Sequence, residues 1–250
     1  MGIQHEVRRR IGPVVRPRLD RLGTSLLAPP RTGFGSYHQH GDRSQRTVSL
    51  TFDDGPSRPS TESMLDVLDD LDVQATFFCV GEMVEWYPDI VQRAHHSGHI
   101  VASHSMYHSR AQAASLRSDA HLTATDDAIE RAIGMRPSLY RPPWGWLTPW
   151  EARRVRRRGQ TIIGWDVYPD DWKDPETDAA VTAEQVCSRV QPGSIILMHD
   201  ATSNIRNCQK TQSAIAVRII VERLRADGYE FVTIPEMLGV SPYAAESTHD

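Results

Sequence analysis

TVSLTFDDGP, residues 47–56, places a short alternating segment directly before two adjacent carboxylates. The first five residues alternate as in a half-buried β-strand. Asp53 and Asp54 follow, and Gly55-Pro56 then interrupts regular structure. One Asp suffices for such a turn, whereas two neighbouring carboxylates repel each other unless a cation or a proton separates them. The pair therefore indicates either a simple turn or a metal or acid-base site at the end of a strand.

Six further apolar or β-branched runs follow this strand along the chain. They are ATFFCV, HIVASH, SLYRPP, TIIGWDV, SIILMHD and YEFVTI, with helical patterns between them. The clearest helix start is Thr148-Pro149-Trp150-Glu151, in which Thr148 is the expected N-cap and Glu151 closes a capping box. Strands that alternate with helices predict parallel pairing, in an α/β barrel or a doubly wound sheet.

Length and charge limit the remaining possibilities. The 250 residues suit one domain with one substantial core. A net charge of -4 gives no general attraction to nucleic acid or membranes, and no apolar run approaches the about 20 residues of a bilayer span. The first residues, MGIQHEVRRRIGPVVRPRLDRL, lack the apolar segment of a secretory signal, so we expect a cytoplasmic protein. Cys79, Cys187 and Cys208 form no close-spaced metal motif and no disulfide framework.

Residues 1–45 are rich in Arg, Gly, Pro and polar groups and show no sustained period. We expect them to form a partly irregular N-terminal extension. Because every predicted strand begins after Arg46, deletion of residues 1–44 is expected to leave a folded domain.

Unusual polar residues lie at the carboxyl ends of five predicted strands, the edge at which α/β barrels place their active sites. They are Asp53-Asp54, His104, Arg141, Asp166 to Trp172, and His199-Asp200. In HSMYH, a helical turn would put His104 and His108 on one face, where they can bind one ion. With one Asp they make a three-ligand set that leaves positions for water and substrate. The alternative for this spacing alone is a solvated helix face.

Two other segments at this edge suggest chemistry. RPPWG has a cation, Arg141, at a strand end, and its two prolines stiffen the backbone so that the N–H of Trp144 can be aimed at an oxyanion. A structural loop with an exposed Arg is the alternative. SIILMHD places His199 at the same edge, where it is either a functional group or a buried, hydrogen-bonded histidine.

These segments, in this order, resemble the motifs of the polysaccharide deacetylases of carbohydrate esterase family 4, the NodB homology domain. The resemblance covers residues 46–240 and leaves 241–250 as a C-terminal tail. It implies a distorted (β/α) barrel with about seven parallel strands. It also implies an enzyme that uses a divalent metal ion, usually Zn²⁺, to remove acetyl groups from N-acetylated sugars.

The resemblance further implies a role for each matching residue. Asp53 matches the catalytic base, Arg141 the residue that orients it, His199 the general acid, and Asp171 the acidic partner of His199. The implied metal ligands are Asp54, His104 and His108. The implied substrate contacts are the N–H of Trp144, for the oxyanion, and the side chains of Trp172 and Leu197, around the acetyl methyl group.

One motif departs from the family pattern. Where the family has D-x-x-D-W, this chain has YPDDW, with Tyr168 at the first Asp position and Asp166 or Asp170 as candidates to replace it. The expected binding partner is an N-acetylated glycan substrate, and no nucleic acid partner is expected. Alternatives are the same site acting on a non-sugar or cyclic amide, and a carbohydrate-binding protein without turnover. The complete acid-base set disfavours the latter.

Overall fold

The computed structural model describes residues 37–109, 118–172 and 177–245. Its centre is a curved sheet in which all pairs of named strands are parallel. The strand order is β1-β6-β5-β4-β3-β2-β7, and β8 pairs with β2. The strands are β1 (Tyr37–His38), β2 (Thr47–Asp53), β3 (Thr76–Cys79), β4 (Ile100–Ser103), β5 (Leu139–Tyr140), β6 (Thr161–Ile163), β7 (Ser194–His199) and β8 (Glu230–Phe231).

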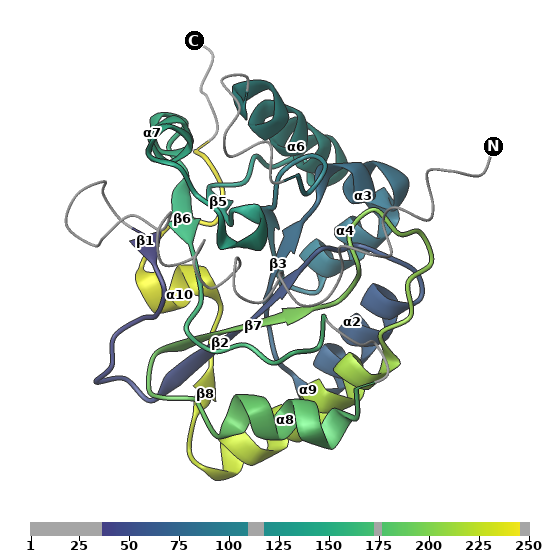
Figure 1. Cartoon of the computed structure of the whole chain (residues 1–250), viewed down its shortest axis with the longest axis vertical. Helices are drawn as coiled ribbons and strands as arrows, with labels where there is room; N and C mark the ends of the chain where they lie inside the picture. Colours follow the sequence, from purple (N-terminus) through teal and green to yellow (C-terminus); the bar gives the residue numbers. More distant parts are fainter. Residues whose placement is uncertain (1–36, 110–117, 173–176, 246–250) are drawn as a thin grey trace, which may run out of the picture.

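Helices cover the outside of this sheet, with α8 and α9 together on one side and α3, α4 and α6 on another (Figure 1). They are α2 (Ser60–Leu71), α3 (Gly81–Trp86), α4 (Pro88–His96), α6 (Ser118–Ile133), α7 (Pro149–Arg157), α8 (Ala179–Cys187), α9 (Thr211–Ala226) and α10 (Ile234–Leu238), with a 3₁₀ turn, η1 (Pro143–Gly145). The architecture is the expected distorted (β/α) barrel. Each of the seven predicted strands is present.

Alternation along β2 explains how the first motif reaches the barrel interior. Val48, Leu50 and Phe52 lie in the main core, between the sheet and the helices. Because successive side chains of a strand point to opposite faces, Thr51 and Asp53 face the interior of the curve. The same alternation on β7 turns His199 to that interior. The polar ends of β2 and β7 therefore lie above an apolar interior.

A second core fills the interior itself. It consists of one residue from each of five strands and one from α10, namely Phe78, Ala102, Leu139, Ile163, Ile195 and Ile234. At α7, Oγ1 of Thr148 accepts a hydrogen bond from the N–H of Glu151 at 3.2 Å, which confirms the predicted N-cap. The Glu151 carboxylate accepts a hydrogen bond from the hydroxyl of Tyr140 at 2.8 Å, so it ties the helix to β5.

The structure adds a strand from within the range that the sequence assigns to the extension. Tyr37 and His38 form β1 and pair with Ile162 and Ile163 of β6. Tyr37 lies so close to Gly164 that a Cβ there would approach its hydroxyl oxygen to 2.7 Å. A few residues later, Arg43 forms an ion pair with Asp166 at 2.7 Å. Residues 37–45 are therefore part of the packed fold.

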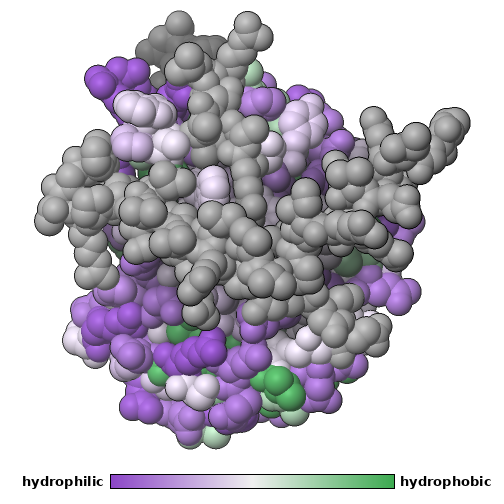
Figure 2. Space-filling model, in the orientation of Figure 1, coloured by the Kyte–Doolittle hydropathy of each residue, from purple (hydrophilic) through white to green (hydrophobic). Residues whose placement is uncertain are grey.

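The tail assigned to residues 241–250 also makes contacts within its described part. The hydroxyl of Tyr243, which is mostly buried, accepts a hydrogen bond from the N–H of Val101 at 3.2 Å. On the face shown in Figure 2, the described residues are mostly hydrophilic, with hydrophobic residues in small separate groups. Within the described ranges, no helix combines the length and the apolar character needed to cross a membrane.

Candidate metal centre and active site

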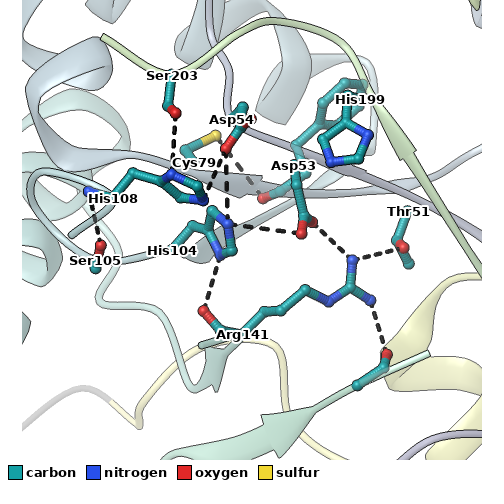
Figure 3. Close-up of polar contacts among 12 residues, drawn as sticks. Thr51, Asp53, Asp54, Cys79, His104, Ser105, His108, Arg141, His199 and Ser203 are labelled. Carbon is teal, nitrogen blue, oxygen red and sulfur yellow. Dashed lines mark hydrogen bonds and ion pairs between the residues drawn. The ribbon is translucent and has the colours of Figure 1, made fainter. Parts of the chain in front are cut away.

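Asp54, His104 and His108 converge at the carboxyl ends of β2 and β4 (Figure 3). One potential ligand atom from each lies within 4.8 Å of the others. Nε2 of His108 is 3.2 Å and Nε2 of His104 is 3.8 Å from Oδ1 of Asp54. The structure corrects the expected helical turn: HSMYH is not helical, and left-handed backbone at Ser105 (φ 69°) and His108 (φ 47°) returns the second ring to the first.

The donor set fits a metal ion. Oδ1 of Asp54 and Nε2 of His104 are buried polar atoms without a hydrogen-bond partner among the described residues. Leaving such atoms unsatisfied costs about 1–3 kcal/mol each, which a bound cation would offset. Burial, together with the neighbouring His108, lowers the pKa of His104 to about 3, so its imidazole is neutral, as metal binding requires. Its Nδ1 donates to the carbonyl oxygen of Arg141 at 2.8 Å, which leaves Nε2 for an ion.

The neighbouring carboxylate, Asp53, has a different environment. Its Oδ1 accepts a hydrogen bond from Nη1 of Arg141 at 2.7 Å, and both side chains are nearly completely buried. The guanidinium also donates to Oγ1 of Thr51 at 2.8 Å and to the carbonyl of Gly164 at 2.9 Å. Burial raises the pKa of Asp53, and the Arg141 charge limits that rise. Arg141 thus holds Asp53 in place, while the adjacent Asp54 faces the two imidazoles.

His199 lies directly opposite Asp53 in the pairing of β7 with β2. Its Nδ1 and Oδ1 of Asp171 are 2.9 Å apart, and its backbone N–H donates to Oδ2 of Asp171 at 2.8 Å. Burial lowers the pKa of His199, but the Asp171 carboxylate outweighs that effect and holds the pKa above its usual value. A histidine with a carboxylate partner therefore lies beside the buried carboxylate of Asp53.

The three predicted substrate contacts lie on segments next to the metal ligands, to His199 or to its partner Asp171. Trp144 adopts a left-handed backbone (φ 61°) within η1, and its ring centroid is 4.8 Å from that of His108. Leu197 lies two residues before His199 on β7, so both side chains point to the same face. Trp172 follows Asp171 and leaves 36% of its surface exposed.

Asp166, one of the two candidates to replace the missing Asp of the fourth motif, is hydrogen-bonded to residues other than His199. Its carboxylate accepts hydrogen bonds from Arg43 at 2.7 Å and from the N–H of Ile195 at 2.8 Å. Ile195 is at the start of β7, four residues before His199. The backbone N–H of Asp170 donates to the Gln185 side chain at 2.8 Å, which directs that segment toward α8.

Two residues near the site, Ser203 and Lys210, were not identified from the sequence, and a third, Asp200, was noted there only as the neighbour of His199. The buried ammonium of Lys210 donates to the carbonyl of Asp171 at 2.9 Å, and Ser203 contacts Nδ1 of His108 at 3.0 Å. Asp200 accepts a hydrogen bond from Thr61 at 2.6 Å, and its burial raises its pKa to about 7. Ser203 and Lys210 lie in loop sequence without a diagnostic spacing, so only the folded chain identifies them.

Comparisons with known proteins agree with this fold and arrangement. The family model of polysaccharide deacetylases matches residues 40–161. The peptidoglycan-N-acetylmuramic acid deacetylase PdaC of Bacillus subtilis (strain 168) is 34% identical over 197 residues, 78% of this chain and 39% of that protein. The chitooligosaccharide deacetylase of Bradyrhizobium sp. (strain ANU 289) is 33% identical over 214 residues, 82% of this chain and 96% of that protein.

A solved structure shows the same similarity in three dimensions. The crystal structure of the Bc1960 peptidoglycan N-acetylglucosamine deacetylase, in complex with 4-naphthalen-1-yl-N-oxidanyl-benzamide, is 31% identical. The structural alignment covers 83% of this chain and 95% of the deacetylase chain, with a TM-score of 0.77. The fold is therefore that of the carbohydrate deacetylases to which it is compared, and the chain belongs to the polysaccharide deacetylase family. It spans about two fifths of the length of PdaC and nearly all of the Bradyrhizobium protein.

Proposed function

We propose that this chain is a zinc-dependent hydrolase that removes N-acetyl groups from oligo- or polysaccharides containing N-acetylhexosamine and releases acetate. One observation carries the proposal: a three-residue metal-binding group lies beside a buried carboxylate held by Arg141 and a histidine held by Asp171. A carbohydrate-binding protein has no need of such an acid-base pair.

Asp54, His104 and His108 would hold the ion, and two imidazoles with one carboxylate are a common ligand set for catalytic zinc. When bound, the ion polarises the acetyl carbonyl and the attacking water. Three protein ligands leave positions for both. We assign the proton transfers and the binding of the oxyanion to groups of the protein itself.

Asp53 is assigned as the general base. Oδ1 of Asp53 accepts the hydrogen bond from Arg141, and its Oδ2 lies 3.6 Å from Nε2 of His104. The nearness of this second oxygen to a proposed metal ligand supports its assignment as the acceptor of the water's proton. The backbone N–H of Trp144, in the turn stiffened by Pro142 and Pro143, is assigned to the developing oxyanion.

His199 is assigned as the general acid. Its Nδ1 is engaged by Asp171, so Nε2 carries the proton that goes to the departing amine. A sugar amine expelled without a proton is a very poor leaving group, which is why the reaction needs this acid. Trp172 and Leu197 are assigned to the apolar wall around the acetyl methyl group.

The substrate class rests on what related proteins share. PdaC is named for N-acetylmuramic acid in peptidoglycan, and the Bradyrhizobium protein for chito-oligosaccharide. Both substrates carry an acetamide on a hexosamine, so we propose an N-acetylhexosamine unit as the substrate of the present chain.

The test is a substrate panel with the zinc-loaded protein. We expect an N-acetylated chito-oligosaccharide to yield acetate and free amine in equal amounts, whereas simple non-sugar acetamides and cyclic amides react far more slowly. Hydrolysis of a cyclic amide in preference to the sugar would favour the alternative substrate. Absence of acetate from any glycan would contradict the proposed function.

A further inference from the structure

Residues 201–208, here called the 201–208 loop, lie in the segment between β7 and α9 and contact one of the candidate metal ligands. Oγ of its Ser203 lies 3.0 Å from Nδ1 of His108 (Figure 3). One residue later, Nδ2 of Asn204 donates to the carbonyl of Tyr107 at 3.4 Å. The loop therefore contacts both the side chain of His108 and the backbone just before it.

The loop is anchored at both ends. Before it, Asp200 accepts a hydrogen bond from Thr61 at 2.6 Å and packs against Gly55, where an added Cβ would come within 2.1 Å of its Oδ2. At the far end, the N–H of Cys208 donates to Oγ of Ser57 at 3.0 Å. These contacts fix the loop to the TFDDGP turn and its continuation into α2.

The middle of the loop is held as well. The Tyr87 hydroxyl donates to Asn207 at 3.2 Å, and the Arg206 guanidinium lies 4.1 Å from the ring centroid of Trp86. Asn204 and Asn207 have left-handed backbone (φ 62° and 56°), which asparagine tolerates better than most residues. The backbone that carries Ser203 is therefore held by contacts on both sides of this residue.

His104 and His108 are oriented by different means. His104 follows a strand, and its Nδ1 donates to a main-chain carbonyl, which no substitution removes. His108 lies in an irregular loop, and among the described residues its ring nitrogen Nδ1 shares a hydrogen bond with the side-chain hydroxyl of Ser203. When Nδ1–H donates to Oγ of Ser203, Nε2 keeps its lone pair and points to Asp54, 3.2 Å away.

We propose that Ser203 is a positioning residue for the metal centre: it fixes the ring orientation and the tautomer of His108 that bind the ion. The inference rests on the proposed function because it assumes that the Asp54-His104-His108 group binds a metal. It adds a residue outside the five motifs, and it assigns a role to the 201–208 loop.

The test compares Zn²⁺ affinities by competition with a chromogenic chelator, without any substrate. We expect Ser203→Ala to weaken binding about 10- to 100-fold, the usual loss when a residue behind a metal ligand is removed. Ser203→Thr and Ser203→Val form a matched pair of nearly equal shape that differs in the hydroxyl. Thr is expected to retain the affinity and Val to lose it. Ser188→Ala removes a serine that bonds to the Glu184 carbonyl on α8, and it is expected to leave the affinity unchanged.

The thermal unfolding temperature of each metal-free variant is measured beside these titrations. If Ser203 had a purely structural role, the Ser203→Thr and Ser203→Val variants would lose stability equally. Equal affinities for wild type, Ala and Val, or equal losses in Thr and Val, would overturn the role of Ser203 while leaving the proposed function intact. A wild-type protein that binds no Zn²⁺ would overturn both.

Discussion

Asp53 and Arg141 form an ion pair, 2.7 Å between Oδ1 and Nη1, in which the two side chains are 5% and 0% exposed. A carboxylate this deeply buried would take up a proton if it had no partner. Arg141 also supplies the main-chain carbonyl that accepts the hydrogen bond from His104. One residue therefore holds Asp53, the proposed base, through its side chain and the imidazole of His104, a proposed metal ligand, through its backbone.

Replacement of Arg141 by Lys separates these two roles. The backbone contact to His104 survives, so the metal content is expected to stay near wild type. An ammonium cannot reproduce the fork that reaches Asp53, Thr51 and Gly164, and loss of one or two charge-assisted hydrogen bonds is expected to lower kcat/KM by about 10- to 100-fold.

The pH profile of Arg141→Lys gives an independent check. Asp53 works in its ionised form, so activity falls as the pH drops through its pKa. A less well-placed cation raises that pKa, and the acidic limb moves to higher pH. An unchanged profile and rate would contradict the assigned role of Arg141.

Substitutions of the two adjacent carboxylates are expected to have different effects on bound metal and activity. Asp54→Ala removes one of three metal ligands and is expected to lower bound metal and activity together. Asp53→Asn keeps the shape and all three ligands, so it is expected to retain the metal while losing about 10²- to 10⁴-fold in rate. Elemental analysis beside acetate release separates them. A metal-free Asp53→Asn protein would reverse the two assignments.

Asp171 is expected to set the alkaline limit of activity. His199 donates a proton, so the rate falls as the pH rises through its pKa, which the Asp171 carboxylate keeps above the usual value. Asp171→Asn removes that carboxylate and is expected to move the alkaline limb to lower pH, with bound metal retained. Profiles of kcat/KM for the wild type and the variant, measured at equal metal content, decide this. Coincident alkaline limbs would reject the pairing.

The N-terminal boundary is tested with two deletions. A chain lacking residues 1–36 keeps β1, whereas a chain lacking residues 1–44 also loses Tyr37 and the Arg43–Asp166 ion pair. We expect the longer deletion to unfold with a free energy lower by about 2–4 kcal/mol than the shorter one, mainly from lost aromatic packing. Denaturant unfolding measures the difference. Equal stabilities would place the boundary near residue 46.

The seven strands and the polar residues at their ends were predictable from local pattern. Period-two alternation in TVSLTF places Asp53 on the face opposite Leu50 and Phe52, and parallel pairing brings the ends of the strands to one edge. The convergence of Asp53, His104, Arg141 and His199 follows from those two rules.

The remaining features depend on contacts between distant segments. Tyr37 and His38 form a strand because the edge of β6, more than 120 residues later, is available to them. HSMYH has the spacing of a helical pair, but left-handed residues bring its histidines together. Ser203 belongs to no motif, and its position follows from anchors at Ser57, just before α2, and at Trp86 of α3.

The most direct test of the account is a titration of the chelator-treated protein with Zn²⁺ while acetate release from an N-acetylated chito-oligosaccharide is followed. The rate is expected to be negligible without metal, to rise in proportion to added Zn²⁺, and to level off at one equivalent per chain. His104→Ala, measured in parallel, is expected to show no such rise. Full activity in the metal-free protein, or no acetate at one bound equivalent, would contradict the assignment of this site as a metal-dependent deacetylase centre.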